Sequence, residues 1–391
     1  MKEMDPLLWE WQKTETELAE KNRSLKELDF FLSLPPYPVA SGPKVIMTGL
    51  CFPDEILRAL GLPFCYVAGE SFEDPRLRET HLPKDSDDAA RSVCGILKSG
   101  LLALSKEDVL LVPLCDDNMK KLGAMVSDLV TVLCFEVPPA KEDPLYQERF
   151  SYEVKRVTKE LEKHFGKRLS RGKLKEQCRL SKKAAEAFCE LENTYRDKDA
   201  LSAAAFLFLA NTYCRCGDKA DWTRHLIRLT EELKETPDSV PGTDAKILLF
   251  GSPVYPPNYK VLSVLEEMHM KPCTILHPDI GHIKAGGKTD PETASIRSLA
   301  LLYLALDLSP AFIKNDLVPK LVRDALEDGG IRGIVAHDLK GQIEYDYQFS
   351  SVEKLAAGYG IPANQIETVY NYQDVEQIRL RLQAFSEMLG R

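Results

Sequence analysis

Cys94 and Cys115 are the two cysteines whose positions favour chemistry. Cys94 lies in a polar segment with Gly95 and Lys98, and Cys115 ends an apolar run that gives way to Asp116 and an acidic helix start. Proteins with alternating strands and helices place their chemistry where a strand or loop turns into a helix. Because a thiolate is a soft ligand, two thiols at such positions predict one shared centre for a soft metal.

A competing interpretation is that both thiols pack as small apolar residues, which is common for free cysteine. The other cysteines are expected to pack in this way, although Cys51 lies at a strand end that points toward the same cleft. The ten cysteines include no CxxC pair, and the closest two are Cys214 and Cys216, so their spacing does not support a zinc finger. A disulfide framework belongs to short secreted domains and is not expected here.

The composition favours a small-molecule or protein partner. The chain has 391 residues, a formal net charge of -9 and a pI of about 5.5, so binding to nucleic acid, which needs clustered lysine and arginine, is not expected. It contains no GxGxxG or P-loop motif, and we expect no nucleotide to bind to it. No stretch approaches the ~18 apolar residues of a membrane span. We therefore expect a cytoplasmic protein of two or three domains without a membrane partner.

The elements that must position these thiols form a first α/β lobe over residues 37–145, after a helical arm at residues 1–36. Short apolar runs predict the strands, and helical spacing with charged first turns predicts the helices between them. The predicted strands are residues 44–49, 64–68, 108–114 and 131–137, and the predicted helices are 53–60, 89–104 and 119–128. Strands that alternate with helices indicate a parallel sheet.

Residues 146–240 show helical spacing without strands and predict a helical connector, which ends in the turn-forming residues 236–243. A second α/β lobe follows at residues 241–391. Its predicted strands are residues 246–250, 273–276, 333–336 and 367–370, and its predicted helices are 259–268, 295–306, 317–327 and 375–389. The fold class is therefore α/β with two parallel-sheet lobes, and chains of this kind bind ligands between their lobes.

Other side chains could hold a proton or a metal. Glu55 lies in the first turn of a helix beside the predicted cleft, where it could move a proton or simply favour the helix N-terminus by its charge. His337 follows a predicted strand and is a candidate ligand, acid or substrate contact, with a satisfied polar loop residue as the alternative. His277, Asp279 and His282 could form a mononuclear metal site, although a polar loop in the cleft is the simpler interpretation.

The chain resembles the D-component family of 2-hydroxyacyl-CoA dehydratases and benzoyl-CoA reductases. Cys94 is followed by Lys98 and Ser99, and Cys115 by Asp116, at the places where the family has its first two cluster cysteines. The resemblance spans most of the chain. The other similar segments are residues 49–63, 246–253, 333–338 and 374–389.

This resemblance implies two flavodoxin-like, or Rossmann-like, lobes with an iron–sulfur cluster between them, either [4Fe-4S] or larger. Cys94 and Cys115 would bind the cluster iron, and His337 would stand at the place of the third ligand. The resemblance further implies a dimer with a homologous subunit and an ATP-dependent iron–sulfur activator that delivers an electron at low potential. The substrate would be an acyl-CoA thioester or another small molecule, and Glu55 would move a proton during radical dehydration.

His337 also marks a departure from the family, which has a Cys-Asp pair at the place of His337 and Asp338. Imidazole can bind iron, and it raises the potential of a cluster relative to thiolate. A further family cysteine is absent at residues 308–311, which are Leu-Ser-Pro-Ala. Three functions therefore stay open: an iron–sulfur subunit of a dehydratase or benzoyl-CoA reductase type enzyme, a small-molecule reductase of the double-cubane type, and a non-catalytic partner subunit.

Overall fold

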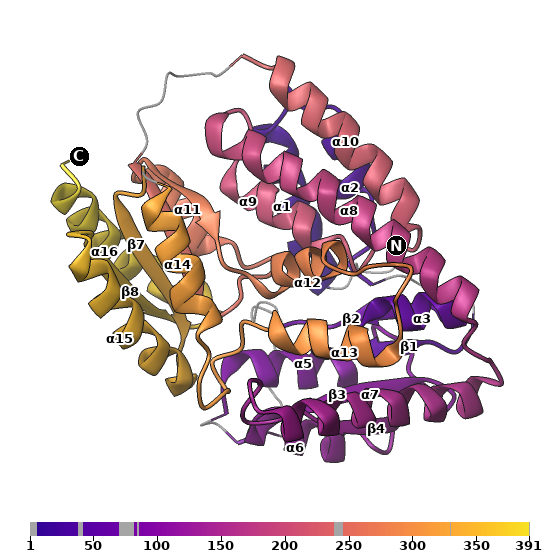
Figure 1. Cartoon of the computed structure of the whole chain (residues 1–391). Coiled ribbons are helices and arrows are strands. Elements are labelled where there is room, and N and C mark those ends of the chain that lie inside the picture. The colour runs from indigo at the N-terminus through magenta and orange to yellow at the C-terminus, as the bar shows by residue number, and fades with distance from the viewer. Residues whose placement is uncertain are drawn as a thin grey trace.

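Two parallel four-stranded sheets, each flanked by helices, form the framework of the protein (Figure 1). The computed structural model describes residues 6–37, 42–69, 82–83, 86–237, 245–328 and 330–390. The sheet order is β2-β1-β3-β4 in the first lobe and β6-β5-β7-β8 in the second. The strands are β1 (Val45–Met47), β2 (Phe64–Tyr66), β3 (Val109–Leu114), β4 (Thr131–Glu136), β5 (Ala245–Gly251), β6 (Met270–Ile275), β7 (Gly333–Leu339) and β8 (Ala363–Thr368). The predicted α/β class with two flavodoxin-like lobes is confirmed.

Each sheet reverses its winding direction between its two central strands. β1 pairs with β2 on one side and β3 on the other, and β5 pairs in the same way with β6 and β7. β3 and β7 are apolar runs that are buried almost throughout, as expected for parallel strands covered on both faces. In sheets of this kind, ligands bind outside the carboxyl ends of the strands at the point of reversal.

Aspartate caps start two helices of the first lobe, whose helices are α3 (Asp54–Leu60), α5 (Asp88–Lys98) and α6 (Asp117–Met125). Asp87 accepts the backbone N–H of Ala90 at 2.8 Å, and Asp116 accepts that of Met119 at 2.9 Å. Each cap satisfies a backbone donor that the helix leaves free, and it fixes the point at which the chain turns from strand or loop into helix.

The second lobe differs from the prediction in four elements. β8, predicted at residues 367–370, spans Ala363–Thr368. β7 continues through His337 and Asp338 to Leu339, because its ladders to β5 and β8 continue beyond Ala336. The predicted polar loop after β6 is a helix, and a further helix, which the sequence patterns did not predict, precedes β8. The helices of this lobe are α11 (Lys260–Glu267), α12 (Pro278–Gly287), α14 (Leu317–Glu327), α15 (Ile343–Gly358) and α16 (Val375–Met388).

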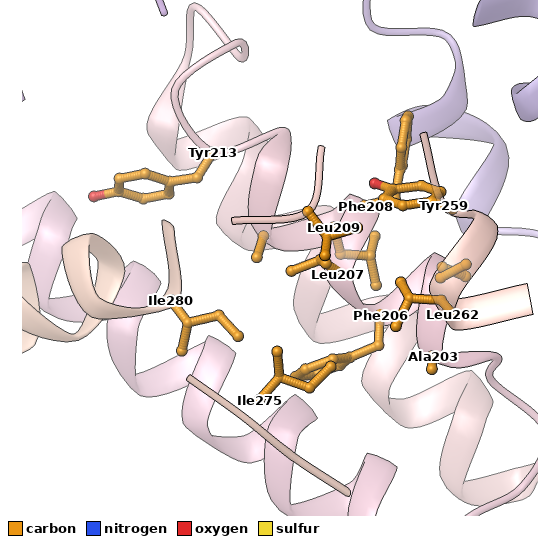
Figure 2. Close-up of a cluster of buried hydrophobic side chains, with 14 of the residues drawn as sticks. Ala203, Phe206, Leu207, Phe208, Leu209, Tyr213, Tyr259, Leu262, Ile275 and Ile280 are labelled. Carbon is orange, nitrogen blue, oxygen red and sulfur yellow. The ribbon is translucent and has the colours of Figure 1, made fainter. Parts of the chain in front are cut away.

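The helical connector and the N-terminal arm pack together around α9, in which all nine residues are buried. Figure 2 shows Phe206 and Phe208 of α9 among Tyr259, Leu262 and Ile275, which come from α11, β6 and the segment before them. The helices are α1 (Pro6–Lys21), α2 (Leu28–Leu32), α7 (Pro144–Phe165), α8 (Arg171–Asp197), α9 (Ala203–Asn211) and α10 (Lys219–Glu235). In the ranges that the structure describes, no helix is long and apolar enough to cross a membrane.

Helix α13 (Ile296–Ala305) ties the lobes together, because it follows β6 in the chain yet packs on the first lobe. Its residues Leu299 and Tyr303 share an apolar cluster with Val45 and Met47 of β1 and with Phe150 of α7. In Figure 1, α13 lies over the first lobe, beside α7 and β3. The second half of the chain therefore supplies part of the wall of the first lobe.

Candidate functional site

A cavity of about 240 Å³ lies between the lobes, at the carboxyl ends of both sheets. The segments after β1 and β3 contribute Cys51 and Cys115, and those after β5 and β6 contribute Tyr255 and Pro278. Tyr303 of α13 forms another part of the wall. This is the position at which doubly wound α/β sheets bind their ligands. The cavity is therefore the candidate active site.

Two thiols, those of Cys51 and Cys115, line this cavity. Cys51 is buried and Cys115 is partly exposed, and the Cys115 thiol donates a hydrogen bond to Oδ2 of Asp116 at 3.1 Å. Burial, followed by the Asp116 carboxylate, raises the pKa of Cys115 well above its ordinary value. Burial, followed by Asp307, does the same to the pKa of Cys51. Both side chains are therefore protonated thiols at neutral pH in the free protein.

Asp307 is the cavity carboxyl group best suited to carry a proton. Burial raises its pKa, while the N–H of Ser309 and the ammonium of Lys141 act in the opposite direction. The Ser309 N–H donates to Oδ1 of Asp307 at 2.8 Å, and Lys141 Nζ donates to the backbone oxygen of Asp307 at 2.8 Å. A carboxyl group with a raised pKa can serve as a general acid or base near neutral pH. Sequence reasoning missed Asp307, although it directly precedes the departure from the family at residues 308–311.

A cluster of charges centred on the fully buried Asp54 lies behind the cavity wall. The Asp54 carboxylate accepts a hydrogen bond from Arg58 Nε at 2.6 Å and lies 2.9 Å from Lys219 Nζ and 3.1 Å from His282 Nε2. Burial alone would raise the pKa of Asp54, but Lys219, His282 and Arg58 hold it well below its ordinary value. The carboxylate therefore stays charged and connects α3, α10 and α12.

His282 is the member of this cluster that reaches the cavity. Its Nδ1 lies 2.9 Å from the backbone oxygen of Leu50, and its Nε2 faces Asp54. Because both of these partners only accept hydrogen bonds, the geometry favours the doubly protonated imidazolium. Burial lowers the pKa of His282, but Cys214 and Asp54 overcome this and raise it well above its ordinary value. The cavity therefore has a fixed positive charge in one wall.

Glu55, the predicted proton carrier, is buried behind Tyr303. Both carboxylate oxygens of Glu55 lie within hydrogen-bond distance of the Tyr303 hydroxyl, at 3.0 and 2.9 Å. Glu55 is not among the described residues that line the cavity, whereas Tyr303 is. Burial, followed by Glu55, raises the pKa of Tyr303 well above its ordinary value, so its hydroxyl stays protonated. The role of Glu55 in proton transfer stays a prediction, and its contact fixes the Tyr303 hydroxyl.

Hydrogen bonds between the lobes hold the cavity walls in register. The hydroxyls of Tyr66 and Tyr255 lie 3.0 Å apart, one from each lobe, and both residues line the cavity. Gln342 Nε2 donates to Asp87 at 3.3 Å, which adds a second link between the lobes. These two contacts therefore link the lobes beside the cavity.

The three predicted cluster ligands lie in different surroundings. Cys115 lines the cavity, whereas Cys94 is fully buried in α5 within an apolar cluster and is not among the described cavity residues. His337 lies inside β7, where its Nδ1 is 2.7 Å from the backbone oxygen of Ser252 and burial lowers its pKa to about 4. The thiol that lines the cavity together with Cys115 is that of Cys51. Within the described ranges, no three His, Cys, Asp or Glu side chains are grouped to hold a metal ion.

The histidines around α12 have structural partners. His277 caps this helix, since its Nδ1 accepts the N–H of Asp279 at 3.2 Å, and its Nε2 lies 3.1 Å from the backbone oxygen of Val254. Both of its ring nitrogens are therefore occupied. His282 contacts Asp54 and the backbone oxygen of Leu50. The contacts of both histidines therefore hold α12 in place beside the cavity.

Comparison with known proteins assigns this architecture to a family. The family model described as 2-hydroxyglutaryl-CoA dehydratase, D-component, matches residues 50–389, which include every strand except β1 and every cavity residue named above. The chain is also 25% identical over 361 residues to YjiM of Escherichia coli (strain K12), a protein provisionally named as a dehydratase subunit. That similarity covers 86% of this chain and 89% of YjiM.

Proposed function

The chain belongs to the 2-hydroxyglutaryl-CoA dehydratase D-component family, and we propose that, as a dehydratase-type subunit, it holds the acyl group of a 2-hydroxyacyl-CoA thioester between its lobes. The observation that carries this proposal is the cavity at the carboxyl ends of both sheets. It combines tyrosine hydroxyls, a buried cation and a carboxyl group whose pKa is raised. The family name supports dehydration of the thioester over the alternative of small-molecule reduction.

The cavity offers separate groups for the oxygen atoms and the carbon chain of such a substrate. Of the hydroxyls of Tyr66 and Tyr255, one donates to the other, so a single O–H of this pair is left to donate to a carboxylate, a hydroxyl or a thioester oxygen. The Tyr303 hydroxyl donates to Glu55 and offers a substrate only its oxygen as an acceptor. Met119 and Val137 provide apolar surface for the carbon chain. Shape and hydrogen-bond direction together would fix the orientation of the acyl group.

Charge stabilisation and proton transfer fall to different residues. The imidazolium of His282 lies in the wall, where its positive charge favours the negative end of the polarised thioester carbonyl. Loss of water from a 2-hydroxyacyl group requires a proton to leave the neighbouring carbon and a proton to reach the departing hydroxyl. Asp307, whose pKa is raised, is suited to carry out one of these proton transfers.

The iron–sulfur role implied by the family is the finer part of the proposal, and the donor set of this chain does not fit it well. A cluster of this kind is held by three or four ligands, mostly thiolates. Here the cavity has two thiols, while Cys94 lies in the apolar interior and His337 is bound to Ser252. When bound, a cluster supplies one-electron chemistry. We derive no step through it and assign the electron-accepting cluster to a homologous partner subunit, which would be the one served by an ATP-dependent activator.

Iron and sulfide content after anaerobic purification tests this assignment. We expect less than one cluster equivalent in the isolated chain and no loss on changing Cys94→Ser. A full cluster in the wild-type chain that is lost in both Cys94→Ser and Cys115→Ser, but kept in Cys178→Ser, would contradict the assignment. It would show that this chain itself binds the cluster. Cys178 suits the control because it is buried in α8 and lines no described cavity.

Thioester binding is tested by titration calorimetry with 2-hydroxyglutaryl-CoA. The substitution Met119→Trp fills part of the cavity and should weaken binding at least tenfold. Met388→Trp is the matched control, because Met388 is largely exposed at the end of α16. Absence of binding by the wild-type chain, or equal binding by both variants, would contradict the proposal.

A further inference from the structure

The exposed face of α7 carries a row of lysines. The opposite face of this helix is buried and packs on α13 and β4. Lys155, Lys159 and Lys163 are all exposed and are spaced four residues apart, so they lie on one side of the helix. At 1.5 Å per residue, this row is about 12 Å long. It therefore forms an extended line of positive charge on the outside of the first lobe.

The positive charge continues through the turn between α7 and α8. Residues 155–183 contain twelve lysines and arginines and only three glutamates, in a chain whose formal net charge is -9. Residues 163–173 contain no carboxylate side chain at all. Nine of the twelve cations are exposed and form no ion pair in the described part of the chain, namely Lys155, Lys159, Lys163, Lys167, Arg168, Arg171, Lys173, Lys182 and Lys183.

The first turn of α8 adds an unfavourable arrangement of like charges. Arg171 and Lys173 lie at the N-terminus of this 27-residue helix, where the helix dipole is already positive. The first turn contains no acidic residue, and the side chain of Ser170 makes no capping hydrogen bond. Carboxylates stabilise a helix N-terminus, so a carboxylate from another molecule would supply the charge that this turn lacks.

Exposed apolar side chains accompany the lysines on α7. Leu145 is 75% exposed and Tyr152 is 64% exposed. With 3.6 residues per turn, both lie within about 20° of Lys163 around the helix axis. Glu148 lies on the same face, but it is paired with Arg297. Tyrosine is enriched among the residues that dominate protein–protein interfaces, so this combination of side chains favours a protein partner.

We propose that the exposed face of α7, together with the residues that lead into the first turn of α8, binds an acidic helix of a partner protein. A helix can present carboxylates at the same four-residue spacing as Lys155, Lys159 and Lys163, so the two rows can pair along their length. Apolar side chains of the partner helix would cover Leu145 and Tyr152. This inference goes beyond the proposed function, because no residue of this surface lines the cavity between the lobes.

Fluorescence anisotropy of a labelled peptide with the full chain tests this inference. The peptide is an amphipathic helix of about three heptads, with leucine on the contact face of the first heptad and glutamate on that of the other two. The triple substitution Lys155→Glu, Lys159→Glu and Lys163→Glu should weaken binding by about tenfold or more, because it replaces three attractions by repulsion. Salt at about 1 M, where the Debye length falls to ~3 Å, should weaken wild-type binding in the same way.

A matched control reverses three exposed cations of the second lobe, with the same change in net charge. These substitutions are Lys320→Glu, Arg323→Glu and Lys354→Glu, and they should leave binding close to that of wild type. Tyr152→Ala should weaken binding by about threefold or more, whereas Tyr347→Ala, at a similarly exposed tyrosine of α15, should not. Every change is at an exposed position, so an unchanged unfolding midpoint shows that each variant is folded.

Equal binding by wild type and the α7 triple variant would overturn the inference, as would equal losses in the two triple variants. Tighter binding of a DNA strand, or of vesicles that contain phosphatidylserine, than of the peptide would also overturn it, because the surface would then serve another class of partner. Self-association of the chain that is lost in the α7 triple variant would assign the surface to a second copy and would likewise contradict the inference. None of these results bears on thioester binding between the lobes.

Discussion

Removing the charge of Asp54 should destabilise the protein strongly. Asp54 is fully buried, and its carboxylate balances Arg58, Lys219 and His282 at 2.6, 2.9 and 3.1 Å. The substitution Asp54→Asn keeps the shape and leaves these cations without their shared carboxylate. Breaking a buried charge pair costs about 3–5 kcal/mol. This is a large part of the ~5–15 kcal/mol that stabilises a typical domain.

The pH dependence of this effect has a definite sign. The pKa of His282 is raised in the folded state, so its contribution is complete below pH 6.5 and is lost as the pH rises through the folded value. The pKa of Asp54 is lowered, so its contribution is complete above pH 3.8 and is lost as the pH falls through the folded value. The difference between wild type and Asp54→Asn should therefore be greatest between pH 4 and 6.5 and should shrink as the pH rises further.

Urea unfolding followed by tryptophan fluorescence measures this difference, because Trp11 and Trp222 are buried and become exposed on unfolding. Asp117→Asn is the control, since Asp117 is exposed and its pair with Lys120 lies on the surface, and its midpoint should change little. A loss below about 1 kcal/mol for Asp54→Asn, with an unchanged slope, would refute the reasoning, because breaking a truly buried charge pair costs several times more.

Other substitutions test the cavity walls and the packing behind them. Gly287→Ala would bring a Cβ atom to 2.6 Å from that of Ala185 where α12 packs on α8, and it should lower stability by about 1–3 kcal/mol in thermal unfolding. Gly358→Ala meets no atom within 4 Å and should leave stability unchanged or slightly higher, so equal losses would argue against close packing at Gly287. Asp307→Asn should lower turnover of the assembled dehydratase by about 10²–10⁴-fold while thioester binding persists, as expected for a proton carrier. Asp316→Asn, at an exposed pair with Lys314, should leave turnover unchanged, and full activity of Asp307→Asn would remove Asp307 from the chemistry.

The sequence was sufficient for strands such as β3 and β5, because these are continuous apolar runs of parallel-sheet type. The predicted bounds of β3 and β5 lie within one residue of the observed bounds. β8 is mostly polar, and it lies at Ala363–Thr368 and not at the predicted residues 367–370. α12 and α15 were not predicted, because their apolar and polar residues are not segregated onto separate faces. α12 also contains three glycines, which indicate a loop when no tertiary contact is known.

The candidate site was predicted less completely, because it depends on contacts between distant segments. The cleft position of Cys115 followed from the end of an apolar strand. The direction of the Cys94 side chain depends on how α5 rotates against its neighbours, which spacing does not fix. The contacts of Asp54 with Lys219 and His282 join three segments far apart in the chain, so no local pattern could have predicted them. The burial that raises the pKa of Asp307 also depends on the fold and not on a local pattern.

The account depends on the acyl group of a coenzyme A thioester lying in the cavity between the lobes. A crystal structure of the full chain with 2-hydroxyglutaryl-CoA tests this most directly. We predict that the acyl group lies within about 4 Å of the Cys115 thiol and the Tyr303 hydroxyl, which is the distance of direct contact. Thioester bound at another surface, with this cavity free of its acyl group, would contradict the account.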